Sequence, residues 1–121
     1  MKIEEIKLDN GIIETIEKLE EDCIVIKLLR EEKGIIGFAL VDNNAKVNNI
    51  YVEVKLEHRS NGYGMFLFNE ALKEYSKYFD KKELEFKIMN RNLINIIISK
   101  SGGIQIDNDD GIYTYIVPLN K

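Results

Sequence analysis

The sequence contains few of the features that build disulfide-linked, cysteine-metal or membrane-spanning proteins. Its 121 residues include a single cysteine, which excludes an internal disulfide and any metal cluster made of cysteines. No apolar run is long enough to cross a bilayer, and the N-terminus, Met1 to Glu5, is too charged for a signal peptide. We therefore expect a soluble, cytoplasmic protein.

Linker-like sequence is also scarce. There is one proline, the eight glycines fall mostly at predicted turns, and no repeat or low-complexity tract interrupts the chain. Residues 1–121 are therefore predicted to form one domain, long enough to bury a core. The net charge is −4, with acidic and basic residues interleaved, which argues against nucleic acid as a partner. We expect no membrane partner either.

Hydrophobic periodicity predicts an α/β domain of the α+β kind, with a mixed sheet covered by helices on both faces. An antiparallel meander is followed by a strand-helix-strand-helix-hairpin order. The expected elements are a weak strand at 2–8, a helix at 10–20, meander strands at 23–29, 35–41 and 47–56, a helix at 62–79, a strand at 83–89, a helix at 92–101 and a hairpin at 104–106 and 112–117.

The third meander strand leads into a glycine-rich turn that has the character of an anion site. The first N–H groups of the following helix have no partners within the helix, and the helix dipole adds positive charge there. Gly62 and Gly64 let a phosphate approach the backbone, and Arg59 supplies a planar fork of donors. The spacing is not a dinucleotide fingerprint, because position 67 is Leu67, and no P-loop lysine follows.

The turn carries a family resemblance. Its sequence has the form Arg-x-x-Gly-x-Gly from Arg59 to Gly64, with Val54 five residues before the arginine, and it resembles the acyl-CoA motif of the GNAT superfamily of N-acetyltransferases. The second helix resembles the same family's pattern Asn-x-x-Ala-x-x-x-Tyr-x-x-x-Gly-Phe. At those places the chain has Asn92, Asn95, Ser99, Gly103 and Ile104, so the asparagine and the glycine match.

The resemblance implies a GNAT-like acyl-CoA N-acyltransferase fold, with acetyl-CoA as co-substrate and no metal. In the family the turn wraps the pyrophosphate of coenzyme A, and the backbone of the preceding strand holds the thioester. The cofactor-binding residues that this implies are Val52, Glu53, Val54, Arg59, Ser60, Asn61, Gly62, Tyr63, Gly64, Asn92 and Asn95.

The second helix is apolar on nearly every side and is expected to be largely buried. Its polar residues Asn92, Asn95 and Ser99 form one stripe. One interpretation is that they bond to neighbouring backbone, and the other is that they face the amide-bearing pantetheine arm of coenzyme A.

The family's reaction is direct attack of a primary amine on the acetyl thioester, often assisted by a carboxylate on the thioester-binding strand. Glu53 is the candidate base and Glu57 the alternative, while Tyr51 is placed to position a water or supply a proton. Ser99 stands where the family has the tyrosine that protonates the leaving thiolate, so we expect reduced activity. The alternatives are a non-catalytic acyl-CoA sensor and an interaction domain whose turn binds nothing.

The sequence leaves the acceptor of the acetyl group open among several kinds of amine. The family places its acceptor site largely in the region between its first two strands, and here that region is short. The acceptor groove is then open to a small-molecule or peptide amine, or completed by the second subunit of a homodimer. We interpret Cys23 as a core residue and the only histidine, His58, as an exposed loop residue.

Overall fold

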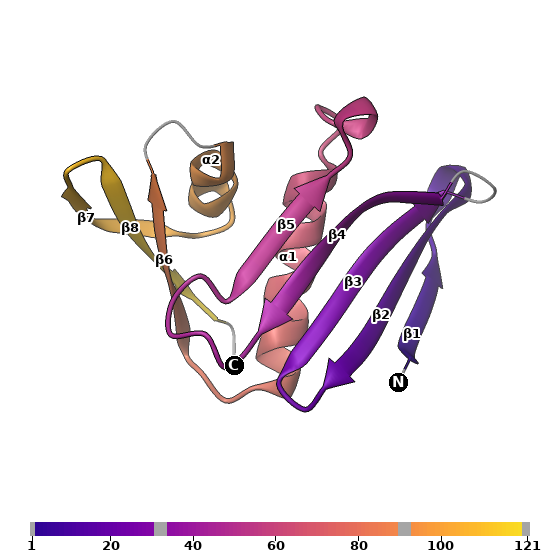
Figure 1. Cartoon of the computed structure of the whole chain (residues 1–121), viewed down its shortest axis with the longest axis horizontal. Coiled ribbons are helices and arrows are strands. Elements are labelled where there is room, and N and C mark those ends of the chain that lie inside the picture. The colour runs from indigo at the N-terminus through magenta and orange to yellow at the C-terminus, as the bar shows by residue number, and fades with distance from the viewer. Residues whose placement is uncertain (1, 31–33, 90–92, 120–121) are drawn as a thin grey trace.

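The computed structural model describes residues 2–30, 34–89 and 93–119 (Figure 1). Its strands are β1 (Lys2–Lys7), β2 (Ile12–Glu20), β3 (Cys23–Arg30), β4 (Gly34–Asp42), β5 (Ile50–Val54), β6 (Glu83–Met89), β7 (Ile104–Asp109) and β8 (Ile112–Pro118). Its helices are α1 (Tyr63–Tyr78) and α2 (Leu93–Lys100), with short 3-10 turns η1 (Asp9–Gly11) and η2 (Leu56–His58).

The strands form two antiparallel sheets. The larger has the order β1-β2-β3-β4-β5 and the smaller the order β6-β8-β7. The predicted antiparallel meander followed by strand, helix, strand, helix and hairpin is confirmed. One feature differs from expectation, because every strand pair in the described residues is antiparallel and the pairs belong to two sheets rather than one mixed sheet.

The helix predicted at 10–20 is wrong, because this segment is strand β2. It pairs with β1 on one side and β3 on the other. Ile12 and Ile16 are four residues apart, a spacing that suits a helix but also places both on one face of a strand. Glu14 lies between them on the same face and is also buried. Because this buried position holds a charged residue, the alternation of apolar and polar residues expected of a strand is not visible in the sequence. The β-branched side chains favour the strand.

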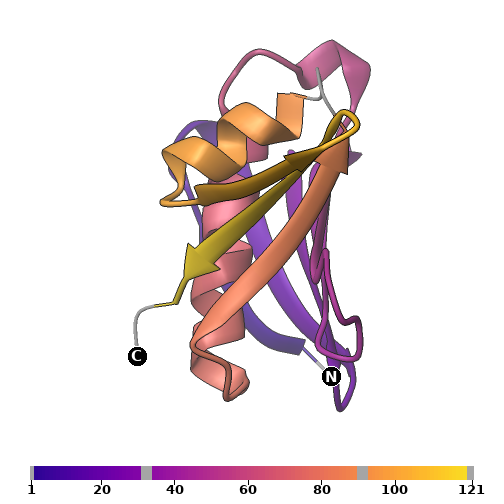
Figure 2. The ribbon, with the colours of Figure 1, turned by 90° about the vertical axis from the view of Figure 1, so that its left-hand side faces the viewer.

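The helix α1 packs its apolar side against the large sheet and carries the core. Leu67, Phe68, Ala71 and Tyr75 are fully buried, and they meet the inward faces of β3, β4 and β5. Phe68 also meets Phe86 of β6, with ring centroids 5.5 Å apart, so α1 joins the two sheets. In Figure 2 both helices lie on the same side of the large sheet, so in the described chain no helix covers its other face, contrary to the prediction.

The two sheets meet at one end of β5 and separate toward the other (Figure 1). Asn48 joins them, with its backbone N–H donating to the Glu85 carbonyl at 2.9 Å. Its side-chain amide accepts from the Lys87 N–H at 2.8 Å and donates to the Lys87 carbonyl at 3.2 Å. The residue needs a positive φ of 55°, which asparagine tolerates. The strand predicted at 47–56 is therefore shortened to Ile50–Val54.

Candidate functional site

The edge of β5 that faces the smaller sheet carries free backbone groups. The Lys55 N–H donates to the Ile36 carbonyl, and the Asn49 carbonyl accepts from the Asp42 N–H. By this register the odd-numbered residues of β5 direct their N–H and C=O groups toward β4 and form its hydrogen-bonded pairs. In an antiparallel pair the alternate residues direct their backbone groups the other way. Val52 and Val54 therefore point their N–H groups into the space between the sheets, where β5 has no strand partner among the described residues.

Close packing against β4 fixes the position of this edge. A Cβ on Gly37 would lie 2.6 Å from the Glu53 carbonyl oxygen and 3.3 Å from a methyl of Leu67. Only glycine lets the β5 backbone approach β4 and α1 this closely. Sequence reasoning missed Gly37, because a glycine within a strand gives no sign of what approaches it.

The turn after β5 leaves the N-terminus of α1 open. Gly62 caps the helix with φ 81° and no side-chain hydrogen bond, and the first helical bond runs from Phe66 N–H to the Gly62 carbonyl. The N–H groups of Tyr63, Gly64 and Met65 thus have no intrahelical acceptor, and the helix dipole makes this an attractive site for an anion.

Two side chains shape the turn. The Arg59 Nε donates to the Val54 carbonyl at 3.0 Å, and Arg59 has no carboxylate partner in the part of the chain that is described. The Asn61 amide donates to the carbonyls of His58 and Arg59 at 3.2 and 3.4 Å. Ser60 adopts a positive φ of 67°. The guanidinium is therefore held beside the open edge of β5 without neutralisation of its charge.

The opposite wall is formed by α2, whose isoleucines approach the turn. A Cβ on Gly64 would lie 3.2 Å from the end of Ile97 and 4.0 Å from Val54. The expectation that α2 is largely buried is wrong, because only Ile98 is buried, while Leu93 and Ile96 are 74% and 53% exposed. The apolar side of α2 that does not pack on the core faces this space instead.

Together these elements line an open cavity of about 540 Å³. Its walls are Tyr51, Val52, Glu53 and Val54 of β5, the segment His58, Arg59, Ser60 and Gly62, the start of α1 at Tyr63, Gly64 and Met65, and Leu93, Ile94, Ile96 and Ile97 of α2. The cavity thus combines free strand N–H groups, a helix N-terminus, one arginine and an apolar wall.

Most residues predicted from the sequence to bind the cofactor line this cavity, and three described site residues do not. Asn61 lies in the turn but does not line the cavity, and Asn92 falls outside the described residues. Asn95 donates to the Met89 carbonyl at 3.4 Å, and its buried amide oxygen has no partner among the described residues. Ser99 is exposed on α2 and does not line the cavity. The functional roles of all of them stay predictions.

Tyr51 and Glu53 form a pair on the sheet face opposite α1. The Tyr51 hydroxyl donates to the Glu53 carboxylate at 3.0 Å, and both side chains are exposed. The hydrogen bond to Glu53 and the negative charge of that group raise the pKa of Tyr51. The hydroxyl is therefore protonated at neutral pH and remains a donor.

Sequence reasoning also missed the isoleucines of α2 as cavity residues and undervalued His58, which lines the cavity. The helical periodicity of α2 shows an apolar surface but does not say whether that surface packs or stays open. The isoleucines could have been singled out only by knowing that α2 stands beside the turn.

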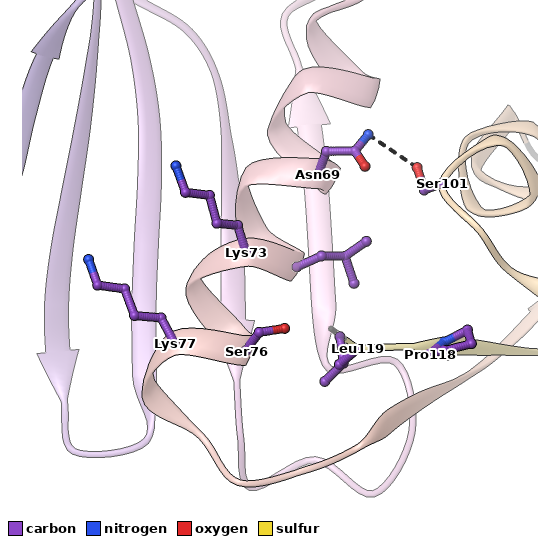
Figure 3. Close-up of a pocket in the computed structure, with 8 residues that line it drawn as sticks. Asn69, Lys73, Ser76, Lys77, Ser101, Pro118 and Leu119 are labelled. Atoms are coloured by element: carbon purple, nitrogen blue, oxygen red, sulfur yellow. Dashed lines mark hydrogen bonds between the residues drawn. The ribbon is translucent and has the colours of Figure 1, made fainter. Parts of the chain in front are cut away.

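A separate hollow of about 450 Å³ lies between α1, Ser101 and the end of β8 (Figure 3). The Asn69 amide crosses it to the Ser101 hydroxyl at 3.2 Å. Lys73 and Lys77 leave α1 on the side of the large sheet, away from Ser101 and Leu119. Both lysines line this hollow, but their ammonium groups point away from Ser101 and Leu119, and the lining includes neither the start of α1 nor the edge of β5.

Comparison with protein-family models gives no match, and no curated protein matches the chain. Solved structures do. A putative acetyltransferase from Acinetobacter baylyi is 19% identical with a TM-score of 0.63, over 80% of this chain and 64% of that one. A GNAT-family acetyltransferase from Streptococcus pneumoniae is 14% identical with a TM-score of 0.67, over 84% and 70%.

The PaiA N-acetyltransferase from Thermoplasma acidophilum, solved in complex with coenzyme A, is 17% identical with a TM-score of 0.60, over 81% and 62% of the two chains. The match therefore spans about two thirds of the length of these three proteins. At such identities the similarity establishes the fold, and the predicted GNAT-like fold class is confirmed. In the described chain, no helix is both long and apolar enough to cross a membrane.

Proposed function

We propose that this chain, which has the fold of the GNAT acetyltransferases, binds acetyl-CoA in the cavity between β5 and α2 and transfers the acetyl group to a primary amine. The observation that carries the proposal is the meeting of two sets of free backbone donors in one cavity. The edge of β5 suits a thioester and its amide-bearing arm, and the uncapped start of α1 suits a pyrophosphate.

The residues present fit this co-substrate. The N–H groups of Tyr63, Gly64 and Met65 would bind phosphate oxygens, with Arg59 adding a charged contact. The N–H groups of Val52 and Val54 would bind the arm and the thioester carbonyl, and the apolar wall from α2 would cover the methylene groups. When bound, acetyl-CoA supplies the activated acetyl group.

The proposed acetyl transfer is a direct displacement of the thiolate by the amine. The amine nitrogen attacks the thioester carbonyl carbon, so a C–N bond forms and the C–S bond breaks. The free N–H groups of β5 stabilise the negative charge that develops on the carbonyl oxygen, a contribution typically of ~10²–10³ in rate. The Glu53 carboxylate accepts the proton that the amine loses, and Tyr51 holds that carboxylate in place through its hydrogen bond.

The thiolate leaves without a tyrosine in the usual place. Ser99 is exposed and outside the cavity lining, so we assign the protonation of the thiolate to water. A thiol has a pKa of about 8.5, so the thiolate is a moderately good leaving group at neutral pH. The exposure of Ser99 also favours a second candidate function, a sensor that binds acyl-CoA without turning it over.

The two candidates separate in an assay of thiol release from acetyl-CoA in the presence of a panel of primary amines. The proposal predicts amine-dependent release, and a Glu53→Gln variant should lose about 10²-fold or more in kcat while binding acetyl-CoA normally. Glu17→Gln, which removes a carboxylate from the same sheet face outside the cavity, should leave kcat unchanged. Binding of acetyl-CoA with no release for any amine would identify the sensor instead.

A further inference from the structure

A second, smaller hollow lies on the sheet face opposite α1. It measures about 300 Å³ and is lined by Ile35, Gly37, Phe38, Glu53 and Lys55. Glu53 is the one residue that lines both this hollow and the proposed acetyl-CoA cavity. The proposed proton acceptor therefore stands between the acetyl-CoA cavity and a separate opening to solvent.

The position of this hollow suits the approach of the acceptor. The helices lie on the other side of the large sheet, and β2 and β3 are joined by the two residues Glu21 and Asp22 without an intervening helix. An acceptor that arrives from this face would reach Glu53 without crossing the space assigned to coenzyme A. A volume of about 300 Å³ is at the small end of ligand sites, which favours a small molecule.

The hollow combines three kinds of contact. Glu53 is an anion held by Tyr51, and Lys55 is a cation two residues further along the same face, roughly 7 Å away along the backbone. Among the described residues neither Glu53 nor Lys55 has an ion-pair partner, so neither charge is neutralised there. Ile35 and Phe38 add a half-buried apolar wall.

We infer that the acceptor is a free α-amino acid with an apolar side chain, bound in the hollow formed by Ile35, Phe38, Glu53 and Lys55. The amino group lies toward Glu53, the carboxylate toward Lys55, and the side chain over Phe38. This inference rests on the proposed function, because it names the substrate class of the same site. An amine without a carboxylate would leave Lys55 without a partner, and the ammonium group of such an amine would be repelled by the Lys55 ammonium.

The test compares L-leucine with L-leucinamide and 3-methylbutylamine, which keep the amine and the apolar stem but remove the carboxylate. With the wild-type protein, kcat/KM for leucine should exceed that for either analogue by about tenfold or more. In a Lys55→Gln variant this preference should disappear, because the charge that reads the carboxylate is gone. Lys46→Gln, which removes an exposed lysine outside the hollow, should retain it.

A binding experiment separates this inference from the proposed function. Leucine added at millimolar concentration to the ¹⁵N-labelled protein, with and without coenzyme A, should shift the amides of Phe38, Glu53 and Lys55, and leucinamide should shift them less. These shifts without any acetyl transfer would support the amino-acid site and overturn the transferase reaction. Turnover of leucinamide or 3-methylbutylamine as efficient as that of leucine, or no leucine-induced shifts, would overturn the inference while leaving acetyl transfer intact.

Discussion

Replacement of Glu14 by glutamine should stabilise the protein by about 2–4 kcal/mol near pH 9 and change its stability little near pH 5. Glu14 is 1% exposed in β2, and while it is ionised neither carboxylate oxygen has a hydrogen-bond donor to accept from in the described residues. An ionised carboxylate in such a place is costly, whereas an amide of the same shape carries no charge.

The groups around Glu14 explain why its pKa is raised. Burial raises its pKa to about 8, and the Glu70 carboxyl adds to this by hydrogen bonding and by its charge, with a smaller contribution from Glu74. Lys73 opposes the shift, and Figure 3 shows it leaving α1 on the side of the large sheet. Once protonated, Glu14 has the O–H that it needs to donate to Glu70, which two ionised carboxylates could not do.

The pH dependence follows from proton uptake. The unfolded chain releases the Glu14 proton near its usual pKa of 4.5, while the folded protein keeps it up to about pH 8. Between these values the folded state binds more protons, so the free energy of unfolding falls as pH rises. Burial also raises the pKa of Glu74, which adds to the same fall. A glutamine at position 14 removes the larger part of this slope.

Urea unfolding of the wild type and the variant near pH 5, 7 and 9 measures the effect. Glu17→Gln, on the opposite face of the same strand, is the matched control and should leave the slope unchanged. A Glu14→Gln variant that is destabilised equally at every pH would show that the carboxylate of Glu14 is not kept protonated by its surroundings.

A second substitution, Gly62→Trp, should weaken acetyl-CoA binding by about 100-fold or more. A Cβ at Gly62 would meet nothing within 4 Å, so the new ring would occupy the open mouth of the cavity and cover the first N–H groups of α1. The residue also has φ 81°, so any side chain there adds strain of about 1 kcal/mol.

Gly62→Ala separates the two effects, because it carries the same backbone strain without the ring. Calorimetric titration should find about tenfold or less loss of affinity in the alanine variant and no measurable binding in the tryptophan variant. Far-ultraviolet circular dichroism checks that both are folded. Tight binding to a folded Gly62→Trp protein would place coenzyme A somewhere other than the turn.

The core of the site could be predicted from the sequence because its signals are local. The alternation of Tyr51, Val52, Glu53 and Val54 sets the two faces of β5, and the glycine spacing after it marks the start of α1. Each of these signals depends on residues that are close neighbours in the chain. Placement of these residues around one cavity followed from the element order.

What could not be predicted depends on contacts between distant segments. Glu14 looks like a solvated residue of a helix, and only its burial against α1 shows that it shares the inward face of β2 with the isoleucines. Asn48 looks like a loop residue until its amide is seen to pair with Lys87 of β6, 39 residues away. The hollow at Glu53 is likewise lined by Phe38 of the neighbouring strand β4. The sequence does not specify that Phe38 lies opposite Glu53.

The central claim is that the free donors of β5 and of the α1 N-terminus together bind acetyl-CoA. Titration of the ¹⁵N-labelled wild-type protein with acetyl-CoA tests it most directly, because each donor reports its own contact. The largest shifts are predicted at the amides of Val52, Val54, Tyr63, Gly64 and Met65. No shifts, or shifts confined to the hollow beside Asn69 and Ser101, would contradict the claim and the acetyltransferase proposal with it.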